Sequence, residues 1–189
     1  MSEDSKNIME LNKYKEIKEH RIKQIIWRIV NHTIFRVLIG GKLFWVRNAI
    51  LKLFGAQIEW HCMIYPSCTI WAPWNLKVGK YTCIGPGTII YNKDKIEIGG
   101  SSVISQQSYL CTASHDTTDP MMALITKPIK IGNRVWITSQ CYIGPGVTVN
   151  DGAICAARSV VIKDVKEWTI VGGNPAKYIK ERTLKTNLE

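Results

Sequence analysis

The sequence has no run of about eighteen uncharged apolar residues, so it offers no segment suited to a transmembrane helix. Its first residues, with Glu3, Asp4 and several lysines, also lack the apolar region of a secretory signal peptide. We therefore expect a cytoplasmic protein. In that compartment its six cysteines would stay reduced and act as small structural side chains.

No two cysteines are spaced as a CxxC pair, and the four histidines are scattered along the chain. A zinc site needs several ligands that the fold brings together, usually at short spacings in the sequence. We therefore predict no metal site.

Acidic residues are scarce, with 15 Asp and Glu against 25 Lys and Arg. Residues 1–57 alone hold 11 basic and 5 acidic side chains, so the excess is concentrated there. A basic balance favours nucleic acid, an anionic membrane or a phosphorylated cofactor as partner. Because no nucleic-acid-binding motif is present, we predict no nucleic-acid partner, and the membrane and the cofactor remain.

What the sequence does contain is a repeat of six residues from Ile58 onward. Of fifteen repeat positions, fourteen are Ile, Leu or Val. These positions are Ile58, Ile64, Ile70, Val78, Ile84, Ile90, Ile98, Ile104, Leu110, Ile131, Ile137, Ile143, Val149, Cys155 and Val161. A hexapeptide repeat predicts a parallel β-helix, in which three repeats make a triangular coil of about eighteen residues. The fold class is therefore an all-β solenoid of about five triangular coils, spanning residues 58–174.

The repeat is interrupted in three places. Two-residue insertions, assigned to Leu76–Lys77 and Ile96–Glu97, fall between coils, where extra chain can bulge at a corner. The third interruption is a loop over residues 116–130. A loop of this length in a compact domain is usually functional or disordered, and this one carries several apolar residues. We expect it to pack against a neighbouring subunit.

Residues 1–57 predict an N-terminal helical region. A first amphipathic helix runs from about Lys13 to Leu38, and a second covers Leu43–Phe54. The apolar face of the first comprises Ile22, Ile25, Ile26, Ile29, Thr33 and Val37. Two interpretations stay open and are compatible: the helices cap the open end of the solenoid, or they lie on the inner face of a membrane. Residues 175–189 predict a short basic C-terminal helix.

His115 is the candidate catalytic residue, because it stands at a corner directly before the long loop. A neutral imidazole there can take the proton of a hydroxyl as that oxygen attacks an acyl carbon. Asn92 and Asp94, one coil earlier, are either candidate ligands for a polyhydroxylated acceptor or ordinary turn residues. Trp136, which we place at the corner of the next coil, is either a packing aromatic or part of the site.

The last coils carry small residues and lysines, which suits a long, thin, phosphorylated ligand. Ala156 and Ala157 would let such a ligand lie flat against the coil. Lys163, Lys177 and Lys180 supply cations for phosphate groups.

Several segments together resemble the hexapeptide-repeat acyltransferases, and within them the sugar O-acetyltransferases of the colanic acid biosynthesis group. The segments that carry the resemblance are Phe44–Asn48, Phe54–Ala56, Ile70–Leu76, Cys83–Gly87, Cys111–Asp116, Ile143–Val149, Gly152–Val165 and Gly172–Lys177. The resemblance implies a left-handed β-helix, a homotrimer with active sites in grooves between subunits, and acetyl-CoA as the acyl donor.

Carried over residue by residue, the resemblance assigns the catalytic histidine to His115 and the tryptophan near the thioester to Trp136. It also implies contacts with the donor at Ser139, Ala157, Ile162, Lys163, Lys177 and Lys180. The chain departs from the relatives at Ile162, where they often have Thr, and at Lys177, where they often have Arg. An acidic pair of the galactoside and maltose acetyltransferases aligns near Asn92–Lys93, so a different acceptor is expected.

These observations predict an acetyl-CoA-dependent O-acetyltransferase that acts on a sugar hydroxyl in exopolysaccharide or capsule biosynthesis. The acceptor would be a sugar or a lipid-linked sugar, and the enzyme a cytoplasmic homotrimer with peripheral membrane contact. Two alternatives remain: an acyltransferase of the same fold with an amine or serine acceptor, and a non-catalytic solenoid that scaffolds partners. The sequence names neither the acceptor hydroxyl nor the acyl group.

Overall fold

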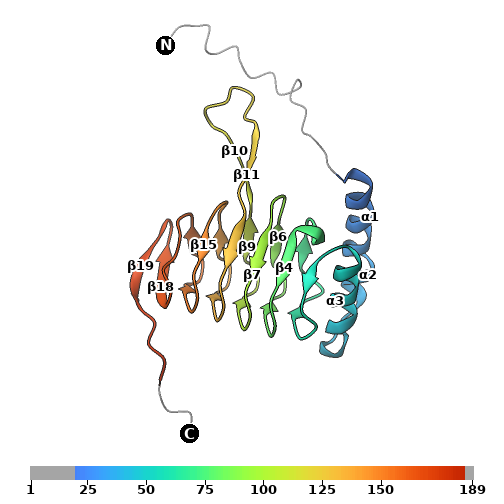
Figure 1. The fold of residues 1–189 in the computed structure, drawn as a ribbon, viewed down its shortest axis with the longest axis horizontal. Helices are drawn as coiled ribbons and strands as arrows, with labels where there is room; N and C mark the ends of the chain where they lie inside the picture. The colour runs from blue at the N-terminus through green and yellow to red at the C-terminus, as the bar shows by residue number, and fades with distance from the viewer. Residues whose placement is uncertain (1–19, 186–189) are drawn as a thin grey trace.

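Residues 20–185 are described by a computed structural model and form a three-sided parallel β-solenoid with helices at its N-terminal end (Figure 1). Each coil contributes one short strand to each of three sheets, which we name A, B and C. The solenoid has about six coils where the repeat predicted about five. The difference arises because the chain makes a further strand, Thr169–Gly173, beyond the last recognised repeat position.

The strands within each sheet pair in parallel from coil to coil. Sheet A contains β1 (Gln57–Ile58), β4 (Leu76–Val78), β7 (Ile96–Ile98), β12 (Ile129–Ile131) and β15 (Thr148–Val149). Sheet B contains β2 (Met63–Ile64), β5 (Cys83–Ile84), β8 (Val103–Ile104), β13 (Trp136–Ile137), β16 (Ile154–Cys155), β18 (Thr169–Gly173) and the antiparallel β19 (Ala176–Glu181). Sheet C contains β3 (Thr69–Ile70), β6 (Ile89–Tyr91), β9 (Tyr109–Cys111), β14 (Tyr142–Ile143) and β17 (Val160–Val161).

The predicted repeat positions form the core. All fifteen side chains are at most 3% exposed. The parallel register places the aliphatic side chains of neighbouring coils next to one another, as in the pairs Ile98–Ile131 and Ile104–Ile137. Each such aliphatic side chain contributes about 1.5–3 kcal/mol on burial, so the stacked interior supplies the main stabilisation of the solenoid.

Small polar side chains at the corners tie each coil to the next. The hydroxyl of Thr82 donates to the carbonyl of Gly99 at 2.6 Å, and that of Ser108 donates to the carbonyl of Thr138 at 2.9 Å. These side chains are fully buried, so the bonds satisfy carbonyl groups that the short strands leave unpaired. This is why the repeat favours a small residue four places after each aliphatic one.

Helices cover the N-terminal end of the solenoid, where the first coil would otherwise expose its core and its backbone (Figure 1). They comprise α1 (Arg21–His32), α2 (Ile34–Val37), the 3₁₀ turn η3 (Gly41–Leu43) and α3 (Phe44–Leu53). Trp27 donates its indole N–H to Ile70 O at 2.6 Å, and Arg47 donates Nε–H to Ile64 O at 2.7 Å. The second predicted helix is confirmed; the first ends at His32, and its expected start near Lys13 lies outside the described residues.

The packed face of α1 is not the isoleucine face. Trp27 and Asn31 are buried against the first coil, whereas Ile22 and Ile29 are 76% and 61% exposed. Asn31 donates to Cys68 O at 3.3 Å, so a polar residue takes an inward position because an edge strand needs a hydrogen-bonding partner. Within residues 20–185, the isoleucine face of α1 is therefore left exposed.

Two sequence-based assignments are wrong in detail. Leu76 and Ile96 are buried strand residues of sheet A, and the extra chain lies just before them, in residues 71–75 and 91–95. In the first of these corners Pro73–Asn75 forms the 3₁₀ turn η4. The extra residues thus widen the corner between sheets C and A.

The predicted C-terminal helix is also wrong over its described part. Residues 176–181 form β19, which pairs antiparallel with β18 and extends sheet B. The hairpin covers an edge that β18 would otherwise leave open, and sequence pattern alone does not show this tertiary requirement. Residues 176–181 therefore extend sheet B as an antiparallel strand instead of forming a separate helix.

The long interruption projects from the solenoid as a two-stranded ribbon (Figure 1). Its strands, β10 (Ala113–His115) and β11 (Leu124–Thr126), pair antiparallel. The repeat resumes at Ile131 as predicted, but its strand, β12, already begins at Ile129, inside the predicted bounds of the loop.

Candidate active site

His115 lies at the end of β10, exposed on the projecting ribbon. Its Nδ1 lies 2.6 Å from the carbonyl oxygen of Met122 across the loop. A carbonyl only accepts hydrogen bonds, so Nδ1 carries the proton and, in the neutral ring, Nε2 holds the free lone pair. The structure thus presents His115 in the tautomer that a general base requires.

Hydrogen bonds within the loop fix the position of the Met122 carbonyl. Asp119 accepts from the backbone N–H of Met121 at 2.8 Å and from that of Ala123 at 3.3 Å, one residue on either side of Met122. Asp116 accepts from both the hydroxyl and the N–H of Thr118, and these bonds lower the pKa of its carboxyl group. The loop is therefore built to hold one conformation.

We call the corner between sheets C and A the CA corner. Several candidate site residues follow one another along it from coil to coil. Trp71 and Tyr91 occupy it in the first two coils, because they directly follow the stacked pair Ile70 and Ile90. The His115 ribbon leaves it in the third. Ile162 reaches it two coils later, where it stands beside Gly144.

Ile162 and Lys163 are thus the two predicted donor residues on the same corner as His115. Lys127, at the base of the ribbon, lies between them and His115 and packs over Gly146, whose φ is +81°. A Cβ at Gly146 would come within 3.1 Å of Lys127 Cδ, so glycine leaves room for this lysine. Sequence reasoning missed Lys127, although its position just before the repeat resumes was a usable signal.

The other donor residues lie elsewhere on the chain. Ser139 and Ala157 stack one coil apart at the corner between sheets B and C, since Ile137 pairs with Cys155 two residues before them. Trp136 stands on the outer face of sheet B, not at a corner as predicted, and donates its indole N–H to Ser105 Oγ at 2.9 Å. Sheet C separates this group from the CA corner, so one chain alone does not assemble all the predicted donor residues.

Lys177 and Lys180 lie on β19, opposite Gly172 and Ile170. Both are exposed. They stand at the C-terminal end of the solenoid, on the same sheet as Trp136.

The prediction that Asn92 binds substrate is wrong. Its side chain is 0% exposed, and it exchanges two hydrogen bonds with the backbone of Ala72, at 2.6 Å and 2.9 Å. The amide therefore closes the widened corner and has no capacity to reach a ligand. Asp94 is half-buried and accepts from the N–H of Lys95 at 2.7 Å, as a turn residue does.

A groove of about 660 Å³ lies between α1 and the CA corners of the first two coils. Its lining combines aromatic, amide and cationic side chains, with Leu124 and Thr126 of the ribbon at one end. The lining comprises His20, Arg21, Gln24, Ile25, Arg28, Trp71, Ala72, Trp74, Asn75, Tyr91, Lys93, Leu124 and Thr126. We call it the α1 groove. Its size is that of a small-molecule site.

The α1 groove and His115 share one side of the ribbon. Leu124 pairs directly opposite His115 in the antiparallel register, and such residues project from the same face. A molecule in the groove therefore approaches the face of the ribbon that carries the imidazole. The sequence signal was present, because the two insertions that widen the corners bring in Trp74, Asn75 and Lys93.

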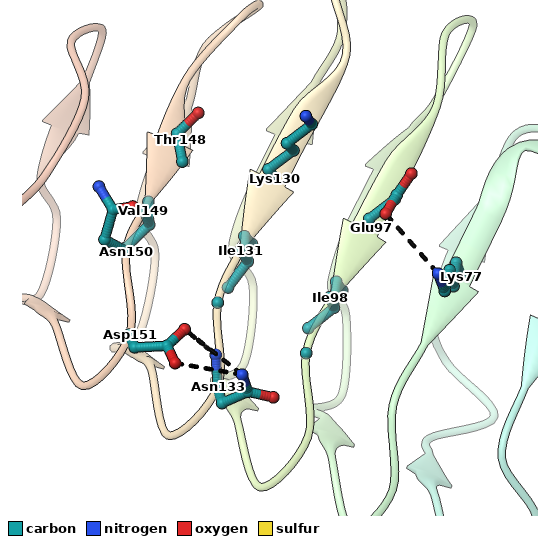
Figure 2. Close-up of a pocket in the computed structure, with 12 residues that line it drawn as sticks. Lys77, Glu97, Ile98, Lys130, Ile131, Asn133, Thr148, Val149, Asn150 and Asp151 are labelled. Carbon is teal, nitrogen blue, oxygen red and sulfur yellow. Dashed lines mark hydrogen bonds and ion pairs between the residues drawn. The ribbon is translucent and has the colours of Figure 1, made fainter. Parts of the chain in front are cut away.

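A second depression, of about 260 Å³, lies on sheet A and its corner toward sheet B (Figure 2). Two pairs of its polar residues bond to each other: Lys77 pairs with Glu97 at 3.9 Å, and Asn133 donates its N–H to Asp151 at 2.8 Å. The latter bond lowers the pKa of the Asp151 carboxyl group. Because this surface lies on sheet A and its corner toward sheet B, and not on the corner that carries the His115 ribbon, we assign it no role in the site.

No family model matches the chain. A relative from Escherichia coli (strain K12), WcaF, named as a colanic acid biosynthesis acetyltransferase, is 40% identical over 165 residues, which cover 85% of this chain and 88% of the relative. The chain belongs to the hexapeptide-repeat acetyltransferases. That identification confirms the predicted resemblance and makes the protein an acyltransferase.

Solved structures agree with this assignment. A maltose O-acetyltransferase from Clostridium difficile 630 superposes with a TM-score of 0.78 at 25% identity, covering 88% of this chain and 90% of that one. A hexapeptide-repeat acetyltransferase from Vibrio cholerae, solved with acetyl coenzyme A, gives a TM-score of 0.73 at 25% identity, covering 97% of this chain and all of that one. The fold is the predicted left-handed β-helix.

Within residues 20–185, no three His, Cys, Asp or Glu side chains are grouped so that they could hold a metal ion. No helix in the described part of the chain has the length and apolar character needed to cross a bilayer.

Proposed function

We propose that the protein transfers an acetyl group from acetyl-CoA to a hydroxyl group of a sugar. The observation that carries the proposal is the tautomer of His115, whose Nδ1 donates to Met122 O and whose Nε2 is left free. This imidazole stands between the α1 groove on one side and Ile162 and Lys163 on the other. Membership of the acetyltransferase family and the names of the relatives supply the reaction and the substrate class.

In the proposed reaction His115 Nε2 removes the proton of the sugar hydroxyl as that oxygen attacks the thioester carbon. The resulting tetrahedral intermediate carries a negative oxygen, which a backbone N–H near Ser139 would stabilise. The C–S bond then breaks, the ester remains on the sugar, and the CoA sulfur takes the proton from the imidazolium. No covalent intermediate on the enzyme is needed.

We also propose that the active enzyme is a homotrimer. The donor residues at the corner between sheets B and C lie across sheet C from His115, so a second chain has to bring them to the imidazole. The outer faces support this assembly: sheet A exposes Lys77, Glu97 and Lys130, whereas sheet B exposes Met63, Val103 and Trp136. An outward apolar row on a sheet is a surface that a neighbouring subunit would cover.

Acetyl-CoA would then lie in the groove between two chains. Ile162 and Lys163 come from the chain that supplies His115, and Trp136, Ser139 and Ala157 come from its neighbour. Lys177 and Lys180, on the same sheet as Trp136, would meet the phosphate groups as point charges.

The acceptor we favour is a lipid-linked sugar used in exopolysaccharide or capsule synthesis. The support is the uncovered isoleucine face of α1, formed by Ile22, Ile25, Ile26 and Ile29, which lies beside the α1 groove. Such a face next to Arg21 and Arg28 suits the surface of an anionic membrane. The enzyme would therefore work at the inner face of the cytoplasmic membrane.

The test is CoA release, measured as free thiol, with acetyl-CoA and a panel of sugar, amine and serine acceptors. Replacing His115 with Ala should lower the rate with the preferred sugar about 10²- to 10⁴-fold, while acetyl-CoA binding, measured by calorimetry, stays unchanged. A variant that releases CoA at the original rate, or a clear preference for an amine acceptor, would overturn the proposal.

A further inference from the structure

The α1 groove has an unusual balance of charge. The cations Arg21 and Arg28 come from α1, Lys93 comes from the opposite wall, and His20 lies at the start of the helix. None of the described residues that line the groove is acidic. Because like charges gathered around a groove raise the local concentration of counter-ions, its contents are expected to be anionic.

The helix geometry brings the two arginines to the same side of α1. Positions 21, 25 and 28 recur with the helical period, and all three line the groove. Gln24 fixes this face against the solenoid by donating to Trp71 O at 3.1 Å. Arginine presents a planar fork that binds phosphate through two parallel hydrogen bonds, so this wall suits a phosphate group.

The opposite wall is aromatic. The rings of Trp71 and Tyr91 meet edge to face with centroids 5.1 Å apart, and Lys93 Nζ lies 5.7 Å and 5.9 Å from the two centroids. An aromatic platform of this kind packs against the apolar face of a sugar ring. A cation beside the platform places positive charge next to the ring that it would hold.

Resting on the proposed function, we propose that the acceptor is a sugar that carries a phosphate or diphosphate group. The sugar ring packs on Trp71 and Tyr91, and the phosphate lies between Lys93 and the arginines of α1. From this position the ring faces the side of the ribbon that carries His115. A sugar linked to a diphosphate group occurs both in polyprenyl diphosphate sugars and in nucleoside diphosphate sugars. The experiment distinguishes these two sources.

The experiment compares one hexose in four forms: the methyl glycoside, the 1-phosphate, the nucleoside diphosphate sugar (nucleotide sugar) and a farnesyl diphosphate sugar. Binding to the intact protein is measured by calorimetry, and CoA release is measured in parallel. We expect the phosphorylated forms to bind at least about tenfold more tightly than the methyl glycoside, with the advantage shrinking as salt rises. Tighter binding of the farnesyl diphosphate sugar than of the nucleotide sugar identifies a lipid-linked acceptor. The reverse order of binding identifies a nucleotide sugar.

Substitutions in the α1 groove test which cations cause the tighter binding of the phosphorylated forms. The double variant R21Q/R28Q and, separately, K93Q should each remove the advantage of the phosphorylated forms while leaving binding of the methyl glycoside unchanged. The matched control R134Q, which removes an arginine at a corner between sheets A and B, should keep that advantage. Equal binding of neutral and phosphorylated forms, or groove variants that behave like R134Q, would overturn this inference and leave the acetyl transfer reaction intact. Phosphate-dependent binding with no CoA release from any form would instead support the groove assignment and overturn the proposed reaction.

Discussion

The imidazole Nδ1 of His115 lies 2.6 Å from the carbonyl oxygen of Met122, seven residues further along the chain. Asp119 accepts hydrogen bonds from the backbone on both sides of that carbonyl. The loop thus orients the imidazole through the main chain, where many enzymes use a carboxylate for this purpose.

Asp119 is accordingly predicted to be a positioning residue. Replacing it with Ala should lower kcat about three- to tenfold, because the Met122 carbonyl loses its support, and should leave the KM for acetyl-CoA unchanged. Asp119→Asn keeps one accepting oxygen and should restore most of the rate. A change confined to KM, or no change in either variant, would contradict this role.

Subunit composition gives a second prediction. His115→Ala and Ala157→Trp should each be inactive alone, the first without a base and the second with a blocked donor groove. If each site takes His115 from one chain and Ala157 from its neighbour, randomly mixed trimers should regain about a quarter of the wild-type activity. The measurement is CoA release after joint refolding of equal amounts. No recovery in mixtures shown to contain both chains would place all these residues in one subunit.

Arg47 gives a prediction about stability. Its side chain is 0% exposed, burial lowers its pKa, and its guanidinium donates to the carbonyls of Leu38, Gly40 and Ile64. Arg47→Met should lower the free energy of unfolding by about 3 kcal/mol, because buried carbonyls lose charged donors. Arg47→Lys should cost less, since an ammonium retains some of these bonds. Urea unfolding measures both, with the exposed Lys42→Met as the control; equal stability of Arg47→Met and this control would contradict the prediction.

Cys68 and Cys155 should be unreactive in the folded protein. Burial raises the pKa of the Cys68 and Cys155 thiols to about 12. At pH 8 only about one thiol in 10⁴ is then ionised, so alkylation at these two positions should require unfolding. Mass spectrometry after timed iodoacetamide labelling tests this, and Cys83, which is half-buried, serves as the internal comparison.

The same shifts predict a loss of stability at alkaline pH. The folded state keeps these two thiols protonated where the unfolded chain, with thiol pKa values of about 8.5, releases protons. The free energy of unfolding should therefore fall as the pH rises from about 8.5 toward about 12. Cys68→Ala should reduce this slope; an unchanged slope would show that other groups control it.

The isoleucine face of α1 gives a prediction about membranes. The triple variant I22Q/I26Q/I29Q should bind anionic phosphatidylglycerol vesicles at least about tenfold more weakly, because each buried isoleucine contributes to partitioning. Its melting temperature should stay unchanged, since these side chains are exposed. Leu184→Gln, at the opposite end of the solenoid, is the control for an exposed apolar residue. Vesicle binding that survives in the triple variant would remove α1 from the membrane contact.

Local pattern was enough to predict much of this protein. The six-residue spacing depends only on residues close in sequence, and it gave the solenoid, its core and the place of the ribbon. His115 was identifiable for the same reason, because it stands where the pattern breaks. Asn92 was assigned wrongly, since only the folded corner shows its amide bonded on both sides to Ala72.

The remaining features depend on which distant segments meet. Whether α1 packs through Trp27 or through its isoleucines was decided by the carbonyl groups of Cys68 and Ile70, which accept hydrogen bonds from Asn31 and Trp27. Likewise, residues 176–181 became a strand because β18 presented an open edge. The α1 groove exists only because a helix from one end of the sequence lies beside two widened corners. Spacing within the sequence determined the solenoid, and long-range burial and hydrogen bonding determined what its surfaces offer to ligands.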